Sequence, residues 1–223
     1  MHNRLFAVAV ILVVSAQLVS AQDALRYRAY ALDSSVDAVL ATTGSRNAEI
    51  KVLHERPALI QDLEWRAPYA TSGTELADPV RTIVFSFCDN LLYRLVVNYD
   101  STRTDGLSNA DVIDSLIATY GAPVPASARN RPLDTPPDSV VLAQWDRSGA
   151  SLTLLRGVYS AEFQLIVISK VSSTRARGAI REAARLDAAD APRREREQRK
   201  QEAADATAAR DKVRASNKAA FRP

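Results

Sequence analysis

The stretch RTIVFSFCDNLLYRLVVNYD, residues 81–100, alternates apolar and polar side chains on both sides of a turn. Such alternation is typical of two antiparallel strands that bury one face. Directly opposed residues share a face, so Phe87 needs an odd-numbered partner. A three-residue loop, 88–90, gives that register and places Asn90 where a left-handed residue is needed. The stretch predicts a β-hairpin with the pairs Phe87–Leu91, Phe85–Tyr93 and Ile83–Leu95. A two-residue turn at 89–90 is disfavoured because it would set Phe85 against Arg94.

Two helices are expected from their hydrophobic spacing and their end signals. In each, a serine is followed three residues later by an aspartate, apolar residues recur at i, i+3 and i+4, and a glycine ends the pattern. These helices are expected at residues 34–44 and 108–121. Outside the hairpin, strands are expected at residues 25–32, 50–53, 58–66, 140–146, 151–157 and 163–170. The last of these is apolar on both faces, which predicts a central strand.

The second half of the chain repeats the pattern of the first. The apolar stripes of the two expected helices lie 77 residues apart, with Val36, Val39 and Leu40 matching Ile113, Leu116 and Ile117. Each helix is expected to precede three antiparallel strands, which is an internal repeat. The sequence therefore predicts an α+β domain at residues 22–172. Its two repeats, at about 25–100 and 106–170, should form an antiparallel sheet with both helices on one face.

A capped helix that ends at glycine, followed by three strands and then repeated, resembles the tandem-repeat fold of β-lactamase inhibitor proteins. A single copy of such a unit resembles the small outer-membrane assembly lipoproteins. The resemblance is carried by residues 33–36 with Gly44, by residues 85–92, and by residues 109–112 with 121–123, and it covers about residues 26–170. It implies a protein-binding module that uses an exposed sheet face and has no active site.

The first 21 residues have the composition of a secretory signal. Arg4 supplies a positive charge, residues 5–14 form an apolar run, and Val19-Ser20-Ala21 is a small-residue cleavage pattern. Cleavage after Ala21 would release a periplasmic or secreted protein, and an uncleaved segment would act as an anchor. The apolar run is short for a membrane span of about 20 residues.

Binding through the sheet face would need aromatic anchors. Trp65 and Trp145 occupy matching places in the two expected repeats, and Tyr93 and Tyr99 lie on the hairpin. Exposed aromatic residues are typical of protein interfaces, although tryptophans at such places are more often core residues. The four residues are therefore candidate contacts for an envelope or secreted protein.

Enzymatic chemistry has few candidates. The mature chain has one histidine, His54, and one cysteine, Cys88, so a zinc site of His and Cys ligands is not expected and no disulfide can form within the chain. No glycine-rich phosphate loop is present, and no cofactor is expected. A hydrolase would have to use Asp62, Glu64 or His54, and alternating carboxylates are more often the wet face of a sheet. We expect a non-enzymatic protein.

The tail, residues 173–223, has 14 Lys and Arg against 8 Asp and Glu, whereas residues 22–172 have 14 against 18. Its densest basic cluster is Arg193, Arg194, Arg196, Arg199 and Lys200. Such a cluster could attach to an anionic envelope surface or an acidic partner, or it could be a solvated face. Interleaved glutamates and the lack of aromatic residues argue against nucleic acid. Pro192 is expected to split the tail into two helix-prone pieces, either helical or disordered.

Overall fold

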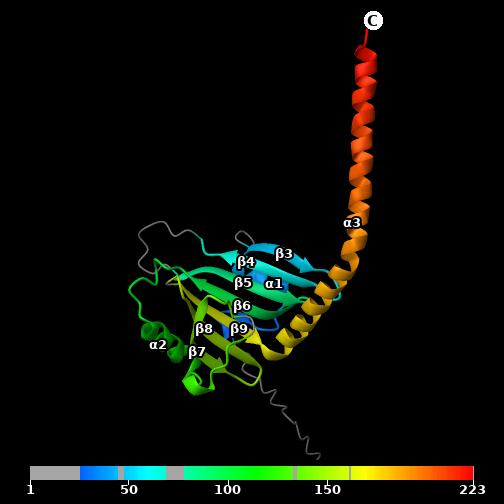
Figure 1. Ribbon diagram of the computed structural model, residues 1–223. Helices are drawn as coiled ribbons and strands as arrows, with labels where there is room; N and C mark the ends of the chain where they lie inside the picture. Colours follow the sequence, from blue (N-terminus) through cyan, green and yellow to red (C-terminus); the bar gives the residue numbers. More distant parts are fainter. Residues whose placement is uncertain (1–25, 45–47, 69–77, 133–134, 161, 223) are drawn as a thin grey trace, which may run out of the picture.

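A computed structural model describes residues 26–44, 48–68, 78–132, 135–160 and 162–222. These residues form an α+β fold with one seven-stranded antiparallel sheet, one two-stranded sheet and three α-helices (Figure 1). The expected signal segment, residues 1–21, lies outside the described residues. Among the helices that are described, none is both long enough and apolar enough to cross a membrane.

The large sheet places the last strand of the chain in its interior, away from both edges. Its order is β3 (Ala48–His54), β4 (Ile60–Arg66), β5 (Val80–Cys88), β6 (Leu91–Tyr99), β9 (Phe163–Ser169), β8 (Ala150–Gly157) and β7 (Ser139–Asp146). All neighbouring strands are antiparallel. The interior position of β9 confirms the prediction from its two apolar faces. The edges of the sheet are β3 and β7.

The hairpin of β5 and β6 has a shorter turn than the sequence predicted. Cys88 pairs with Leu91, so the turn is the two-residue Asp89-Asn90, and both residues have left-handed backbone, with φ of 47° and 67°. The expected three-residue loop is therefore wrong. A β-bulge between Ser86 and Phe87 then shifts the register. The resulting pairs are Phe87–Leu92, Ser86–Arg94, Phe85–Leu95 and Ile83–Val97. The bulge keeps Phe85 opposite an apolar residue, which a plain two-residue turn would not do.

Helices α1 (Val36–Thr43) and α2 (Asn109–Tyr120) pack on the same face of the sheet, here called the helix face. The N-cap of α1 is Ser35, one residue later than expected, whereas α2 has the expected capping box of Ser108 and Asp111. Four strands follow α1 rather than three. The main core lies under the helices, where Phe85, Leu95, Val167 and Leu154 are all 0% exposed. Burial of side chains of this size contributes about 1.5–3 kcal/mol each.

The single strand expected at residues 25–32 is instead a pair of two-residue strands, β1 (Arg26–Tyr27) and β2 (Tyr30–Ala31). The turn between them has Arg28 at φ 55°. Arg28 makes two hydrogen bonds to the Asp78 carboxylate, of 2.5 and 2.7 Å, and the Tyr30 ring packs edge-on against Phe85, with 4.7 Å between ring centroids. These contacts fix the small sheet to the main domain.

Helix α3 (Lys170–Ala220) begins directly after β9 and includes Pro192, so the tail is one helix rather than two pieces. It crosses the opposite face of the sheet, here called the arm face, and then projects far beyond the domain (Figure 1). Figure 1 shows α3 changing direction in its orange part. Pro192 is the proline inside this helix. Proline removes one helical hydrogen bond and kinks the helix there.

Candidate functional site

Helix α3 and the two residues that follow it have three parts with different surroundings, which we call the root (residues 170–190), the spacer (191–205) and the tip (206–222). The root contains buried residues, whereas every residue from 192 to 222 is exposed. We call the spacer and tip together the arm. At 1.5 Å per residue, an arm of this length reaches about 48 Å. The arm is the largest surface in the described chain that packs against nothing.

The root docks on the arm face through small side chains. Ser173, Ala176 and Ala183 are 1%, 0% and 2% exposed. Ala176 packs in a cluster with Ile60, Cys88 and Tyr93, which lie at the turn end of β4, β5 and β6. Small residues let the helix backbone approach the sheet closely. The root therefore packs as part of the folded domain, although the sequence predicted that most of it belongs to the helical or disordered tail.

Ion pairs to the loops at the sheet end hold the root in place. Arg175 pairs with Asp89 in the hairpin turn, and Arg56 pairs with Asp190 near the end of the root. His54 Nδ1 lies 3.8 Å from the Asp187 carboxylate. Hydrogen bonding from Arg56 lowers the pKa of Asp190. Each exposed pair contributes little by itself, and together they join the root to this end of the sheet.

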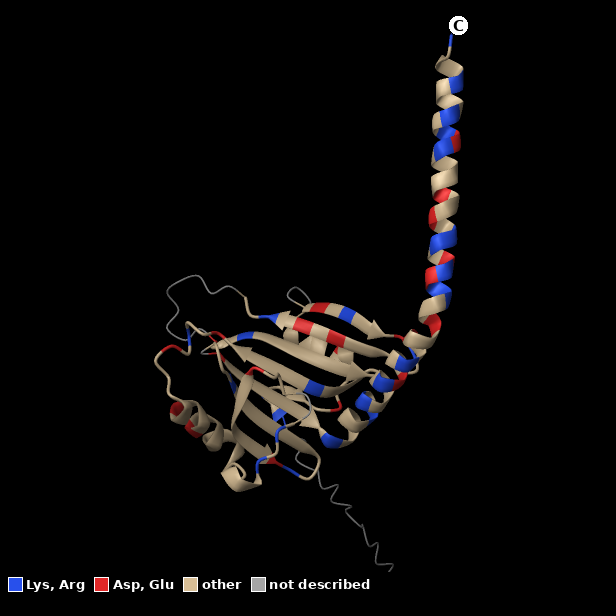
Figure 2. Cartoon of the chain, in the orientation of Figure 1, with Lys and Arg blue, Asp and Glu red and all other residues tan. Residues whose placement is uncertain are grey.

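The spacer is a helix that pairs most of its charges along the same helix. Arg199 lies 3.5 Å from Glu195 and Arg193 lies 4.0 Å from Glu197, both within the spacer, and Arg194 lies 3.3 Å from Asp187 of the root. Such pairs support a solvated helix that has no packed face. The spacer contains the whole predicted basic cluster, Arg193, Arg194, Arg196, Arg199 and Lys200. Because its five cations are set against four acidic residues, its formal charge is only +1. Figure 2 shows the two signs interleaved along this part of α3.

The tip has a different charge pattern. It has five Lys and Arg against one Asp, a formal charge of +4. Arg210, Arg214 and Lys218 recur every four residues within α3, and this spacing places them along one side of the helix, while Arg222 follows just after the helix end at Ala220. Val213 and Phe221 are 59% and 77% exposed. The tip is therefore a cationic surface with two exposed apolar side chains, and it was not singled out from the sequence, although the four-residue spacing of its cations was visible there.

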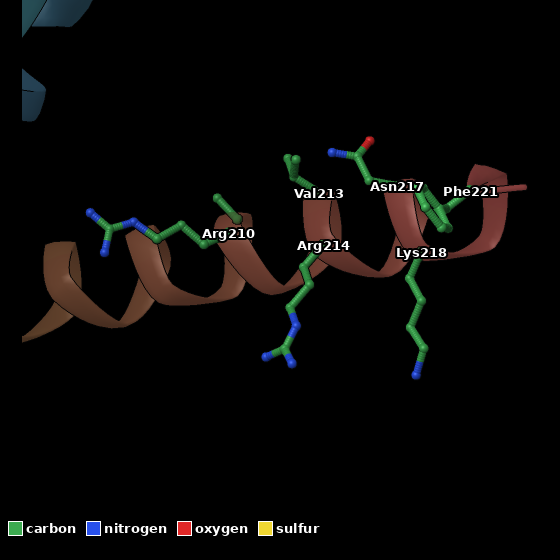
Figure 3. A pocket seen from close by; sticks show the side chains of 7 residues that line it. Arg210, Val213, Arg214, Asn217, Lys218 and Phe221 are labelled. Atoms are coloured by element: carbon green, nitrogen blue, oxygen red, sulfur yellow. The ribbon is translucent and has the colours of Figure 1, made fainter. Parts of the chain in front are cut away.

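Figure 3 shows how the tip side chains lie. Val213 and Asn217 point to one side of the helix, while Arg214 and Lys218 point to the other. A shallow hollow is lined by seven residues of this one helix, from Ala209 to Phe221. One helix has no second wall, so this hollow is an open flank and cannot enclose a substrate. It offers a surface for contact rather than a site for chemistry.

The four predicted aromatic anchors are mostly inside the fold. Trp145 is 1% exposed, and its Nε1 donates to the Gly121 carbonyl at 2.7 Å. Tyr93 is 6% exposed beneath the root. Trp65 and Tyr99 are half-buried against the main core. The structure does not bring the four together on one surface, because Tyr93 lies on the arm face and the others contribute to the core of the helix face.

The residues of the hydrolase alternative are also spread out. Asp62 lies opposite Lys51 and Ser86, Glu64 forms an ion pair of 2.8 Å with Arg66, and His54 faces Asp187. The described part of the chain has no group of three or more potential metal ligands. Cys88 is 3% exposed, and burial raises the pKa of its thiol. Its surroundings are those of a packed residue and not of an activated nucleophile.

Two further hollows lie at the end of the sheet away from the root. One, of about 170 Å³, is lined by Asn98, Ser139 and Gln164 among others, and the second, of about 510 Å³, includes Arg156 and Tyr159. Gln164 donates to Asn98 at 2.7 Å, and Asn98 donates to Thr82 at 2.9 Å. These amides are satisfied by one another across three strands, so they stabilise the sheet.

No protein-family model matches this chain, and comparison with curated proteins and with solved structures found no significant match.

Proposed function

We propose that this chain is an exported, non-enzymatic binding protein that attaches to an anionic envelope surface through the tip of α3. The observation that carries the proposal is the charge pattern of the tip, which combines a row of cations with exposed Val213 and Phe221 at the end of a solvated arm. Cationic helices that also expose apolar side chains bind at the interface of anionic membranes.

The two parts of the arm suit two roles. The spacer has nearly balanced charge and satisfies its own ion pairs, so it has little attraction to an anionic surface. The tip has cations in excess, and it has the only large apolar side chains of the arm, Val213 and Phe221. The tip would bind, and the spacer would hold the sheet domain at a distance of several nanometres from the surface. Binding of this kind is reversible and weakens as salt screens the charges.

Binding of an envelope or secreted protein through the sheet face has less support. The helix face is covered by α1 and α2, and the turn end of the arm face is covered by the root. Trp145 and Tyr93 would have to leave packed positions to reach a partner. Trp65 and Tyr99 keep some accessible surface and remain the better candidates of the four.

The two-repeat hypothesis also remains a proposal. It is supported by the sheet order, in which β4, β5 and β6 on one side of the centre mirror β7, β8 and β9 on the other. The helices end at Gly44 and Gly121, 77 residues apart, and α2 has one more turn at its N-terminus. A duplicated helix-and-sheet unit would suit a scaffold that carries a binding element, and it requires no active site.

Sedimentation with lipid vesicles tests the attachment. The full chain should pellet with vesicles that contain phosphatidylglycerol and stay in solution with vesicles of phosphatidylcholine alone. Arg214→Glu with Lys218→Glu should abolish pelleting. The matched control is Arg196→Glu with Lys200→Glu, which makes the same change in charge at the same spacing within the spacer. We expect the control to keep most of its binding.

The outcomes separate the alternatives. Equal loss in both double variants would show that net charge, and not the tip, determines binding. Pelleting that resists high salt and survives the tip variant would contradict the proposal. Export is tested separately, by N-terminal sequencing of the protein recovered from the envelope or the medium, with Gln22 as the expected first residue.

A further inference from the structure

The two edges of the large sheet differ in how they are covered. Along β7, the loop before the strand supplies hydrogen bonds to the edge. Val124 N donates to the Gln144 carbonyl at 2.7 Å, and the guanidinium groups of Arg129 and Arg131 donate to the carbonyls of Leu142 and Ser139. A covered edge of this kind cannot pair with another strand.

The β3 edge is open. Among the residues that the structure describes, β3 pairs only with β4, and no other strand lies on its outer side. Its seven residues are a long edge by the standards of soluble proteins, which commonly shorten or cover such strands. Ile50 is 44% exposed, Val52 is 46% exposed and Leu53 is 41% exposed. The unpaired backbone and these exposed apolar side chains mark β3 as a surface for strand addition.

The sequence of β3 selects the partner, because it is complementary to itself in one register. Antiparallel pairing centred on Ile50 sets Glu49 opposite Lys51 of the second copy, and Lys51 opposite Glu49. On the other face it sets Ile50 opposite Ile50 and Ala48 opposite Val52. Within residues 48–52, every opposed pair is then either two opposite charges or two apolar residues, and Leu53 and His54 lie beyond this paired segment.

The neighbouring registers lack this complementarity. Centring on Glu49 or on Lys51 places like charges directly opposite each other, which is destabilising in a sheet. If the pairing is centred between Glu49 and Ile50, or between Ile50 and Lys51, a charged residue lies opposite Ile50. Each face of the joined sheet then mixes charged and apolar residues across the seam. We propose that two copies of this chain join through their β3 edges, antiparallel and centred on Ile50, to form one continuous sheet.

The position of the arm is compatible with this joining. Figure 1 shows that α3 passes the His54 end of β3, so the arm flanks the edge and does not lie along it. A two-fold axis through Ile50 would run perpendicular to the sheet and would keep both roots on the same face, at opposite ends of the seam. The pair would then present two arms. Because the seam uses β3 and not the tips, this inference does not depend on what the tips bind.

Charge exchange tests the pairing and its register. Glu49→Lys and Lys51→Glu each turn two attractive contacts of the seam into repulsive ones, and both side chains are exposed. Within one chain, Glu49→Lys faces Glu64 and should not reduce stability, whereas Lys51→Glu faces Asp62 and should reduce it slightly, so urea denaturation of each variant accompanies the test. We expect each single variant to weaken the dimer by about tenfold or more in sedimentation equilibrium of the full chain. The double variant Glu49→Lys with Lys51→Glu restores opposite charges across the seam and should dimerise like the unmodified chain.

The matched control is Glu195→Lys with Lys200→Glu, a charge exchange in the spacer, which should not change the mass in solution. A monomer at all concentrations up to the solubility limit would overturn the proposal. Single variants that dimerise as well as the unmodified chain would overturn it too. If Glu49→Lys with Lys51→Glu does not recover dimerisation, the register centred on Ile50 is wrong. If β3 instead binds a different protein, the assignment of a second copy as the partner is wrong.

Discussion

Arg175 in the root of α3 pairs with Asp89 in the hairpin turn of β5 and β6, 86 residues away. The same aspartate also joins the turn to the start of β4. Its Oδ1 accepts from Leu59 N at 3.0 Å, and its own backbone N donates to the Leu59 carbonyl at 2.9 Å. Asp89 therefore connects three elements at the end of the sheet where the arm leaves the domain.

Two substitutions of Asp89 should separate the stability that comes from its hydrogen bond to Leu59 and its left-handed backbone from the stability that comes from its ion pair with Arg175. Asp89→Ala removes the Leu59 hydrogen bond and places alanine at a φ of 47°, so we expect a loss of about 2–3 kcal/mol in the free energy of unfolding. Asp89→Asn keeps an oxygen acceptor and tolerates left-handed backbone. It loses only the ion pair with Arg175, whose guanidinium is 62% exposed, so we expect a change below about 1 kcal/mol. Urea denaturation measures both.

Arg175→Ala is the control for the ion pair, and it should match Asp89→Asn. Equal destabilisation by Asp89→Ala and Asp89→Asn would mean that the ion pair with Arg175 supplies most of the stability. The left-handed backbone and the Leu59 hydrogen bond would then contribute little.

The root can be tested by placing a charge under it. Ala176 is 0% exposed against Ile60, Cys88 and Tyr93, so Ala176→Glu must either bury an unpaired carboxylate or displace the helix. We expect a loss of about 3 kcal/mol or more. Ala203→Glu, in the exposed spacer of the same helix, should stay within about 0.5 kcal/mol of the unmodified chain.

The single thiol reports the same docking by a second route. Cys88 is buried and burial raises the pKa of its thiol, so the native chain should react slowly with a thiol reagent at neutral pH. Ala176→Glu should increase the rate strongly, and Ala203→Glu should not. Rapid labelling of the unmodified chain would contradict the docked root.

The sequence allowed prediction of the elements that have strong local signals. The alternation at residues 81–100, the capping box of Ser108 and the two apolar faces of the last strand each led to the element that is observed. The bulge at Ser86 was missed because alternation alone does not distinguish a three-residue loop from a two-residue turn followed by an extra residue. The register then changes, and next to the turn the faces change too, because Leu92 rather than Leu91 enters the main core and Tyr93 lies on the arm face.

The candidate site was harder to predict because it depends on long-range packing. Trp145 was a reasonable surface anchor from its position in the repeat, but contact with Tyr120, at 6.4 Å between ring centroids, and its hydrogen bond to Gly121 place it in the core. The basic cluster of the spacer was noted for its density. Its pairing with acidic residues on the same helix, and the different charge of the tip, appear only when the residues are placed on one continuous helix.

Buried tyrosines near the small sheet should make stability depend on alkaline pH. Burial raises the pKa of Tyr27, Tyr99 and Tyr120, and the value for Tyr120 is about 12. Tyr27 also donates a hydrogen bond to Tyr99, which raises the pKa of Tyr27 further. A raised pKa in the folded state means that stability is complete below the unfolded value of about 10 and is lost as the pH rises toward the folded values. The midpoint of urea denaturation should therefore fall above pH 10.

Tyr27→Phe should reduce this alkaline loss, at the cost of lower stability at neutral pH because the hydrogen bond is gone. Tyr159→Phe is the matched control, since its ring is 90% exposed, and it should leave the pH profile unchanged. A profile that does not differ between the Tyr27→Phe and unmodified chains would contradict the assignment. At the acid end, hydrogen bonds from Arg28 lower the pKa of Asp78, so its contribution is present above about pH 4 and is lost as the pH falls below that value.

The direction of the arm should depend on Pro192. Proline is unfavourable inside a helix by about 3 kcal/mol relative to alanine, because it removes one backbone hydrogen bond and its ring clashes with the preceding turn. Pro192→Ala should straighten α3 where Figure 1 shows it change direction, and small-angle X-ray scattering should show a longer maximum dimension. Thr207→Ala, further along the arm, should leave the scattering unchanged. The tip begins 14 residues beyond Pro192 and ends 30 residues beyond it, so even a modest change in bend would move it by many ångströms. An unchanged scattering profile for Pro192→Ala would show that the docked root, and not the proline, determines where the tip lies.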